Sequence, residues 1–314
     1  MARTGPRAVT RALSQGVASV VTVDDFSHGL LNPALAYAIA CLGGFLGLRC
    51  VTLARAYEGS AKTRWLGLAA VSIGAIGIWS MHFIAMLGFT VPGEPIRYNV
   101  PVTVGSMLLA VAVVGAGEFI VAYPRATPTL TDRGRLVAGG AVVGTGVAAM
   151  HYLGMAGVSM PGLMSYNALL VAVSLVIAVV AGTAVLWIGT WISGVKATAG
   201  AGLVMSVAVT GMHYTAMAAL HVRGGGAVPP MAVAAVSGVT GVSGATAAAL
   251  LIPVLLVLGL ATFLLALTVT MSPSEDEIRV DAELERRAER LARRGVTATR
   301  CGGIWRRGLR LSRS

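Results

Sequence analysis

Apolar residues dominate seven long stretches of the chain, and each stretch is separated from the next by a shorter connection. The hydrocarbon core of a bilayer is about 30 Å thick, which an α-helix crosses in about 20 apolar residues. The seven stretches are long enough for this and lie at residues 33–54, 65–89, 100–123, 136–158, 167–192, 199–220 and 248–271. The pattern therefore predicts an all-α, polytopic membrane protein with seven transmembrane helices.

Charged residues are scarce across these stretches. Hydrophobic residues make up 56% of the 314 positions and charged residues only 12%, whereas about 25% of the residues in a soluble domain are charged. Residues 30–271 contain only 10 basic and 4 acidic side chains. The composition therefore excludes an ordinary soluble enzyme. Of the 24 basic residues behind the formal net charge of +11, 11 are arginines after Met271, so the charge gives no indication of nucleic-acid binding.

Basic residues in the connections predict the orientation of the spans, because short loops rich in Lys and Arg are retained on the cytoplasmic side. Every second connection holds most of them: Arg55, Lys62, Arg64, Arg125, Arg133, Arg135 and Lys196. The tail after Met271 adds 11 arginines, whereas the alternate connections hold only Arg97 and Arg223. We therefore expect the N-terminus outside and the C-terminus inside.

A six-residue motif of the form M-H-[FY]-x-x-M occurs three times in the chain. It reads MHFIAM at Met81–Met86, MHYLGM at Met150–Met155 and MHYTAM at Met212–Met217. Successive histidines are 69 and 62 residues apart, which is the length of one hairpin of two spans. The spacing therefore predicts three two-helix repeats followed by a seventh helix.

The motif places one histidine at the same depth in three different spans. Each histidine lies seven residues before the outer end of an even-numbered predicted span, which is about 10 Å below the outer surface. The methionine four residues later shares its helix face, so the six candidate ligands are His82, Met86, His151, Met155, His213 and Met217. The first methionine of each motif is offset by about 100° and could reach such a site only from its rim; these residues are Met81, Met150 and Met212.

Imidazole and thioether donors together favour copper. Thioether sulfur is soft and selects Cu(I), and imidazole also holds Cu(II), whereas zinc more usually has Cys, His and carboxylate ligands. The one acidic residue within a predicted span, Glu118, lies near the opposite, inner end of its helix. There we expect it to pair with a basic residue of a cytoplasmic connection. Ionisable groups at membrane depth are costly and usually functional, so the three motifs indicate a ligand site.

The three motifs at this spacing resemble the MHYT family of bacterial integral membrane sensor proteins, and residues 212–215 read MHYT. The resemblance covers about residues 28–271. It implies a seven-span sensor whose histidines and methionines bind copper near the outer face of the membrane. It also implies that the site senses a diatomic gas, such as oxygen, carbon monoxide or nitric oxide, or the redox state.

The resemblance also implies a location in the cytoplasmic (inner) membrane. The chain as a whole divides into three parts. We expect a disordered leader at residues 1–27, the seven-span sensor domain at residues 28–271, and a charged cytoplasmic tail with a short helix at residues 272–314. The tail has no recognisable enzyme motif, so we expect a non-enzymatic protein that lies in the lipid bilayer and signals to an unknown cytoplasmic partner. No nucleic-acid partner is expected.

Two other functions are compatible with the same motifs. A copper-handling or transport protein would pass the ion inward through the bundle, and it would need soft or polar ligands along the inner half. Few residues there meet this need: Cys41, Cys50, Glu118 and Met205. A structural membrane assembly partner would use the histidines and methionines only for packing, because a single buried histidine is more often packed than metal-bound.

Overall fold

The structure is a computed structural model, which describes residues 20–21, 24–91, 95–124, 130–160, 162–224, 244–273, 277–278, 280–281 and 283–292. Over these residues seven helical spans are long and apolar enough to cross a membrane, so the prediction of a seven-span helical protein is confirmed. The helices are α2 (Leu31–Ala56), α3 (Gly59–Ala70), the π-helix η1 (Val71–Trp79), α4 (Ser80–Met86), α5 (Val100–Ala122), α6 (Asp132–Ala156), α7 (Ala168–Trp191), α8 (Val195–Ala218) and α10 (Ala247–Met271).

Three of these helices form one continuous span. α3, η1 and α4 follow one another without a break over Gly59–Met86. The hydropathy predicted that this span begins at residue 65, because Lys62 and Arg64 interrupt the apolar run. The helix starts earlier because the ammonium group of Lys62 has an acceptor. Its Nζ donates a hydrogen bond of 2.8 Å to the carbonyl of Ala122 at the end of α5.

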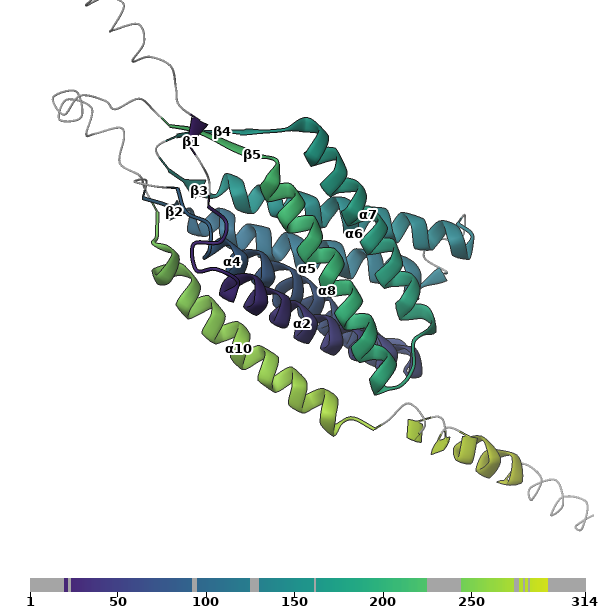
Figure 1. Ribbon diagram of the computed structural model, residues 1–314. Coiled ribbons are helices and arrows are strands. Elements are labelled where there is room, and N and C mark those ends of the chain that lie inside the picture. The colour runs from purple at the N-terminus through teal and green to yellow at the C-terminus, as the bar shows by residue number, and fades with distance from the viewer. Residues whose placement is uncertain are drawn as a thin grey trace, which may run out of the picture.

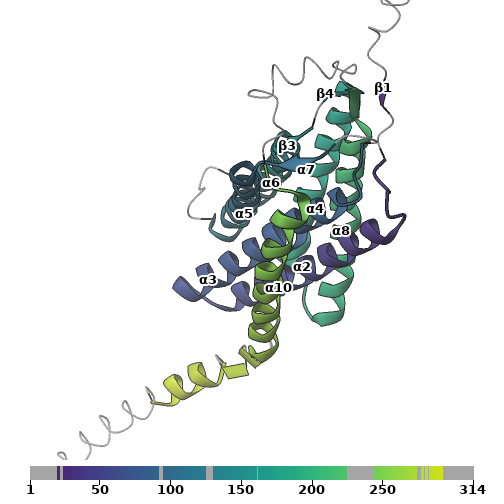
Figure 2. The ribbon, with the colours of Figure 1, turned by 90° about the vertical axis from the view of Figure 1, so that its left-hand side faces the viewer.

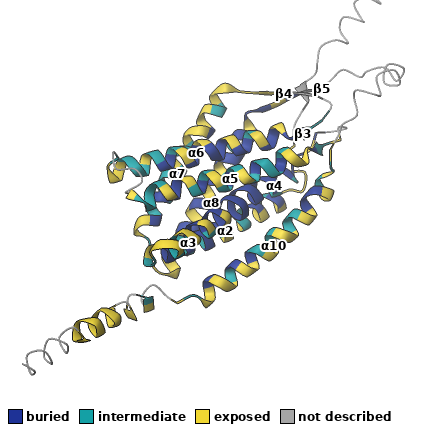
Figure 3. Cartoon of the chain, turned by 180° about the vertical axis from the view of Figure 1, so that it is seen from behind, coloured by how far each residue is buried: buried dark blue, intermediate teal, exposed yellow. Residues whose placement is uncertain are grey.

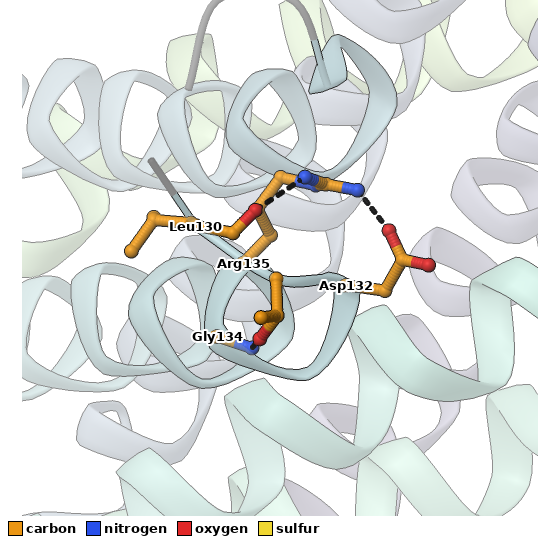
Figure 4. A network of polar contacts seen from close by, with 5 residues as sticks. Leu130, Asp132, Gly134 and Arg135 are labelled. Atoms are coloured by element: carbon orange, nitrogen blue, oxygen red, sulfur yellow. Dashed lines mark hydrogen bonds and ion pairs between the residues drawn. The ribbon is translucent and has the colours of Figure 1, made fainter. Parts of the chain in front are cut away.

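α6 also begins before its predicted start, at Asp132 instead of residue 136. The hydroxyl of Thr131 accepts a hydrogen bond of 3.1 Å from the backbone N–H of Gly134 and caps the helix. Arg135 donates a hydrogen bond of 2.8 Å to the carbonyl of Leu130 and forms an ion pair with Asp132 (Figure 4). The charged residues that precede the apolar run therefore stabilise the first turn of the helix.

The spans pack into a bundle in which buried side chains face inward and exposed apolar side chains face outward (Figure 3). α6 packs between α5 and α7, and α2 packs against α8 and η1. At the contact of α2 with η1, a Cβ on Gly43 would lie only 2.3 Å from the backbone nitrogen of Gly77. Small residues at such contacts let helices approach closely in lipid. α10 lies at the edge of the bundle beside α2 (Figures 1 and 2).

Short strands lie at one end of the bundle, where the hydropathy predicted only loops (Figure 1). β1 (Val20–Val21), β5 (Leu220–Gly224) and β4 (Gly162–Tyr166) form an antiparallel sheet in the order β1-β5-β4. β2 (Arg97–Tyr98) pairs with β3 (Val158–Ser159). Strands of two to five residues are too short to show a period in the sequence. We call this end, which also holds the C-terminal ends of α4, α6 and α8, the motif end, and the opposite end the far end.

Parts of the predicted leader and tail are also described. In the leader, Asp24 exchanges two backbone hydrogen bonds with Thr90, of 3.1 and 2.8 Å. In the tail, residues 277–278, 280–281 and 283–292 are helical. The rest of the predicted leader, residues 1–19 and 22–23, and residues 293–314 of the predicted tail lie outside the described residues. The three-part division and the orientation of the spans stay predictions.

Candidate metal centre

The three motif histidines lie on three different helices and meet inside the bundle. His82 is on α4, His151 on α6 and His213 on α8. Their exposed fractions are only 1%, 1% and 2%. The structure brings these three side chains together, because their ligand nitrogens all lie within 4.8 Å of one another; their depth in the membrane and their role as ligands stay predictions.

The three imidazoles form a nearly symmetrical cluster. The ring centroids are 4.8 Å apart for His82 and His151, 5.0 Å for His82 and His213, and 5.2 Å for His151 and His213. The interplanar angles for the same pairs are 74°, 74° and 79°. The three rings are therefore steeply inclined to one another, and none is stacked on its neighbour.

Hydrogen bonding alone does not account for this arrangement. The Nδ1 atom of His82 lies 3.0 Å from Nδ1 of His213 and 3.2 Å from Nδ1 of His151. An imidazole nitrogen carries either one proton or one lone pair in the ring plane, so it forms one well-aligned hydrogen bond, not two. At least one of the two close contacts therefore brings nitrogen atoms together without a well-placed proton between them.

A shared metal ion fits these distances well. Imidazole bonds to zinc are about 2.0–2.1 Å long, so two such nitrogens on one ion are about 3.3–3.6 Å apart in tetrahedral or trigonal geometry. The observed Nδ1 separations of 3.0 and 3.2 Å need to widen by only a few tenths of an ångström. All three ligand nitrogens lie within 4.8 Å of one another, a bound longer than two such bonds can span. A shared ion therefore also requires the nitrogens of His151 and His213 to lie closer together than this bound.

Two ring nitrogens in the cluster have no protein partner. Nε2 of His82 and Nε2 of His151 are buried and make no hydrogen bond to any described residue. A buried polar atom without a partner costs about 1–3 kcal/mol, so it commonly marks a place where water, an ion or a ligand binds. These Nε2 atoms are not the Nδ1 atoms that approach one another, so the observation indicates a bound group at the cluster without placing it between the Nδ1 atoms.

The π-helix η1 sets the position of His82. The indole Nε1 of Trp79 donates to the hydroxyl of Ser106 on α5, at 3.0 Å, and the hydroxyl of Ser72 donates to the carbonyl of Gly43 on α2, at 2.8 Å. These contacts hold η1 between two neighbouring spans directly before α4. π-helical turns are rare and are found frequently at functional sites, and this one determines how far His82 extends into the cluster.

The aromatic residue after each histidine packs edge-on against it. The ring centroids of the pairs His82–Phe83, His151–Tyr152 and His213–Tyr214 are 4.7, 5.0 and 4.9 Å apart. The hydroxyl of Tyr152 lies 2.9 Å from the hydroxyl of Ser174 on α7. The aromatic residues therefore support the imidazoles by packing, and only one of them is tied to a neighbouring helix through its hydroxyl group.

The six motif methionines are buried in the same apolar core as the histidines. Their exposed fractions range from 0% to 3%: Met81, Met86, Met150, Met155, Met212 and Met217. Met212 also lines a small cavity of about 30 Å³ together with Met205. Burial of all six agrees with a ligand role and equally with packing, so the direct approach of the thioethers to the imidazoles stays a prediction.

Polar residues at the motif end were missed by the sequence reasoning. Oδ1 of Asp25, Nδ2 of Asn32 and the hydroxyl of Tyr214 are buried without a hydrogen-bond partner among the described residues. Burial, and to a lesser extent the neighbouring Asp24, raises the pKa of the Asp25 carboxyl. No motif or regular spacing in the sequence links these three residues, because only the fold brings them close together.

Gly154 provides a direct test of the geometry of the cluster. A Cβ at this position would lie 2.8 Å from Nε2 of His82 and 3.4 Å from the ring of Phe83, so Gly154→Ala should displace the His82 ring. We expect the apparent metal affinity of the purified protein to fall about tenfold, the lower end of the cost of disturbing a ligand's support. The measurement is a metal titration with a competing chelator.

The matched control is Gly211→Ala, two residues before His213. A Cβ there meets no atom within 4 Å, and it lies in the same kind of helix. It should leave the metal affinity unchanged. Equal affinities for the two alanine variants would show that the position of the His82 ring does not matter for binding.

Comparisons with known proteins were made for the whole chain. Residues 76–131 and 144–203 match the MHYT family, which is described as a bacterial signalling protein N terminal repeat. The first matched range contains His82 and the second contains His151, whereas His213 lies beyond both. No solved structure matches the chain.

Several curated proteins are similar to this chain. The bifunctional diguanylate cyclase/cyclic di-GMP phosphodiesterase MucR of Pseudomonas aeruginosa is 37% identical over 199 residues, which is 62% of this chain and 28% of that protein. The cyclic di-GMP phosphodiesterase NbdA of the same organism is 34% identical over 194 residues, or 60% of this chain and 24% of that protein. The signaling protein YkoW of Bacillus subtilis is 30% identical over 192 residues, or 59% and 23%. The chain spans about a quarter of the length of these relatives.

Proposed function

We propose that the chain is a membrane sensor with a copper site formed by His82, His151 and His213, because residues 76–131 and 144–203 match the MHYT family of bacterial signalling proteins. The observation that carries this proposal is the convergence of three buried imidazoles, whose Nδ1 contacts of 3.0 and 3.2 Å do not form a complete set of hydrogen bonds. The matched region is a sensor repeat, so no catalytic activity is assigned to it.

Copper is favoured over zinc by the residues around the cluster. The structure shows no acidic residue in the described metal-ligand group, whereas methionines precede and follow each histidine within its motif. Thioethers select Cu(I) and imidazoles hold both oxidation states. Bound copper would supply a redox-active centre that also takes up a diatomic gas such as oxygen, carbon monoxide or nitric oxide.

The residues of the chain would convert binding at this site into a change in helix packing. The three histidines come from α4, α6 and α8, so a change in the distances between them must move at least one helix. His82 follows η1, which contacts both α2 and α5. A shift of His82 would therefore reach two further spans through Ser72 and Trp79, whose hydrogen bonds hold η1 in place.

The proposed orientation of the protein in the membrane follows from the Lys and Arg residues in alternate connections between the spans. We place the motif end at the outer face of the cytoplasmic membrane, with residues 28–271 as the sensor domain and residues 272–314 as a cytoplasmic tail. In this orientation a gas reaches the histidines from the outer leaflet, and an unknown cytoplasmic signalling partner reads the change at the far end or the tail.

Copper transport is supported less well by the structure. Met212 and Met205 line one small cavity, which could extend a thioether path away from the histidines. The next cavity toward the far end shares Ile73 and Val185 with it, but methionine, cysteine and histidine are absent from its described lining. Along these two cavities the soft ligands therefore end at Met205, about halfway along α8, and the buried Cys50 lines neither cavity.

A copper and gas titration tests the proposed function. The purified protein in lipid nanodiscs is expected to bind Cu(I) and Cu(II) in preference to Zn(II), and carbon monoxide should change the optical spectrum of the Cu(I) form only. Competition with chelators of known affinity measures the first property, and difference spectroscopy measures the second. Preference for Zn(II) would contradict the copper site, and an unchanged spectrum with carbon monoxide would contradict gas sensing.

A further inference from the structure

A separate cavity lies at the far end of the bundle and has a volume of about 240 Å³. Its walls come from α2, α3, η1, α5 and α7, and its lining includes Leu48, Arg55, Lys62, Leu66, Glu118 and Leu186. We call it the far-end cavity. Glu118 lies 18 residues after the first residue of α5, which is about 27 Å along the helix from the motif end, so the cavity is distinct from the histidine cluster.

Glu118 is the unusual residue in this cavity. It is only 4% exposed, and neither of its carboxylate oxygens has a hydrogen-bond partner among the described residues. A carboxylate buried without a partner is strongly unfavourable, and an ionisable residue within a membrane span is usually functional. The expected pairing with a basic residue of a cytoplasmic connection is not found among the described residues, and Arg125 of such a connection lies outside them.

The two basic residues of the cavity are satisfied by other groups. Nη1 of Arg55 donates to the carbonyls of Gly189 and Ile192, both at 2.9 Å, at the C-terminal end of α7. Nζ of Lys62 donates to the carbonyl of Ala122 at the C-terminal end of α5 and lies 4.9 Å from the centre of the Tyr123 ring. Carbonyls at a helix C-terminus carry partial negative charge, so both cations have hydrogen-bond acceptors and a partial counter-charge other than Glu118.

Glu118 is the one charged side chain of the cavity lining that has no partner among the described residues. Arg55 and Lys62 each have the carbonyls of a helix C-terminus as a partial counter-charge. The rest of the lining is almost entirely apolar and includes Leu48 and Leu66. Small-molecule sites are typically apolar with a few polar groups that fix the orientation of the ligand.

We propose that the far-end cavity binds a small organic ammonium ion, with its charged group on Glu118 and an apolar body against the leucine and valine side chains. A volume of about 240 Å³ is below the range of about 300–1,000 Å³ typical of sites for drug-sized ligands. The ligand is therefore a small amine, of about the size of one aromatic ring with a short arm.

Inorganic cations fit this cavity less well. Calcium needs six to eight oxygen ligands and magnesium six, but besides Glu118 the described lining offers only one side-chain hydroxyl, that of Thr190. That hydroxyl already donates a hydrogen bond of 2.6 Å to the carbonyl of Trp187. Soft metals would require sulfur or imidazole donors, which the described lining does not contain.

The experiment compares benzylammonium with its neutral analogue benzyl alcohol and with the anion benzoate. The full chain in nanodiscs of zwitterionic lipid is titrated with each compound by calorimetry, and empty nanodiscs provide the blank. Hydrogen bonds to charged groups are stronger than neutral ones, so benzylammonium should bind at least about tenfold more tightly than benzyl alcohol. Glu118→Gln should remove this difference.

The matched control is Glu58→Gln. Glu58 is exposed at the start of α3, at the same end of the bundle, and does not line the cavity. This variant loses the same charge and should bind benzylammonium as tightly as the unchanged protein. Equal binding of benzylammonium and benzyl alcohol, tighter binding of benzoate, or unchanged binding in Glu118→Gln would each overturn the proposal.

A second measurement does not depend on the folding of a variant. Dicyclohexylcarbodiimide, an apolar reagent for carboxyl groups, should modify Glu118 of the unchanged protein, and mass spectrometry would locate the modification. Saturating benzylammonium should slow this modification at least about fivefold, because the ammonium group covers the carboxylate through a charge-assisted contact, whereas benzyl alcohol should not. Modification at the same rate with both compounds would overturn the proposal. Neither measurement involves copper, so failure of the copper site would leave this result unaffected.

Discussion

Replacing His82, His151 and His213 together by leucine is expected to lower the copper content of the purified protein to the background level. The three substitutions remove every imidazole from the cluster, and the leucine side chains fill most of the vacated volume with apolar atoms. Because Nε2 of two of these histidines has no described partner, leucine also removes buried polar groups that are unsatisfied without a bound group, so the fold should be retained. Metal content is measured by mass spectrometry of the purified protein after a copper soak and desalting.

The matched control uses the two histidines outside the motifs. His28 and His221 are exposed, and their joint replacement by leucine removes imidazoles from the same end of the bundle without touching the cluster. This double variant should keep its copper. Copper that persists in the triple variant, with an unchanged circular dichroism spectrum, would mean that the buried histidines are not its ligands.

Replacing Met86, Met155 and Met217 together by leucine is expected to weaken Cu(I) binding about a hundredfold and to change Cu(II) binding by less than about threefold. The reason is that the softer thioether sulfur favours Cu(I), whereas the imidazoles that remain hold both oxidation states. Methionine and leucine have similar volumes, and such swaps usually cost less than about 1.5 kcal/mol. Titrations with oxidation-state-specific chelators, under reducing and oxidising conditions, measure the two affinities.

Met205→Leu is the control for this prediction. Met205 is 3% exposed and lies on α8 outside the motif, so its replacement makes the same chemical change in the same core. It should leave both affinities unchanged. If the triple methionine variant also binds Cu(I) as tightly as the unchanged protein, the motif methionines are packing residues and the copper site consists of imidazoles alone.

The sequence was sufficient to predict the class of fold and the central residues of the site. Transmembrane helices satisfy their own backbone hydrogen bonds, so length and hydropathy identify them without knowledge of their neighbours. A histidine at one depth in each of three spans is also a local property of the repeat. The convergence of His82, His151 and His213 could therefore be predicted from spacing alone, and the structure confirms it.

The helix ends were predicted less well because they depend on contacts between spans. Hydropathy placed the starts of the second and fourth spans after their basic residues. In the structure Lys62 binds a carbonyl of α5, and Arg135 binds the residues around the start of its own helix. Whether a charged residue ends a helix or stabilises it depends on the acceptors nearby, and the hydropathy of a segment does not include them.

Only the tertiary structure decided how the two candidate sites are built. The π-helix before His82 depends on contacts of Ser72 and Trp79 with other spans, and the close approach of Gly154 to His82 joins residues far apart in the chain. Glu118 was expected to pair with a basic residue, but the helix C-termini bind Arg55 and Lys62 instead.

The sequence determined which helices form and which residues lie at one depth, because these depend on local chemistry and rise per residue. The partners of each buried polar atom depend on packing between helices, so the fold alone decided them.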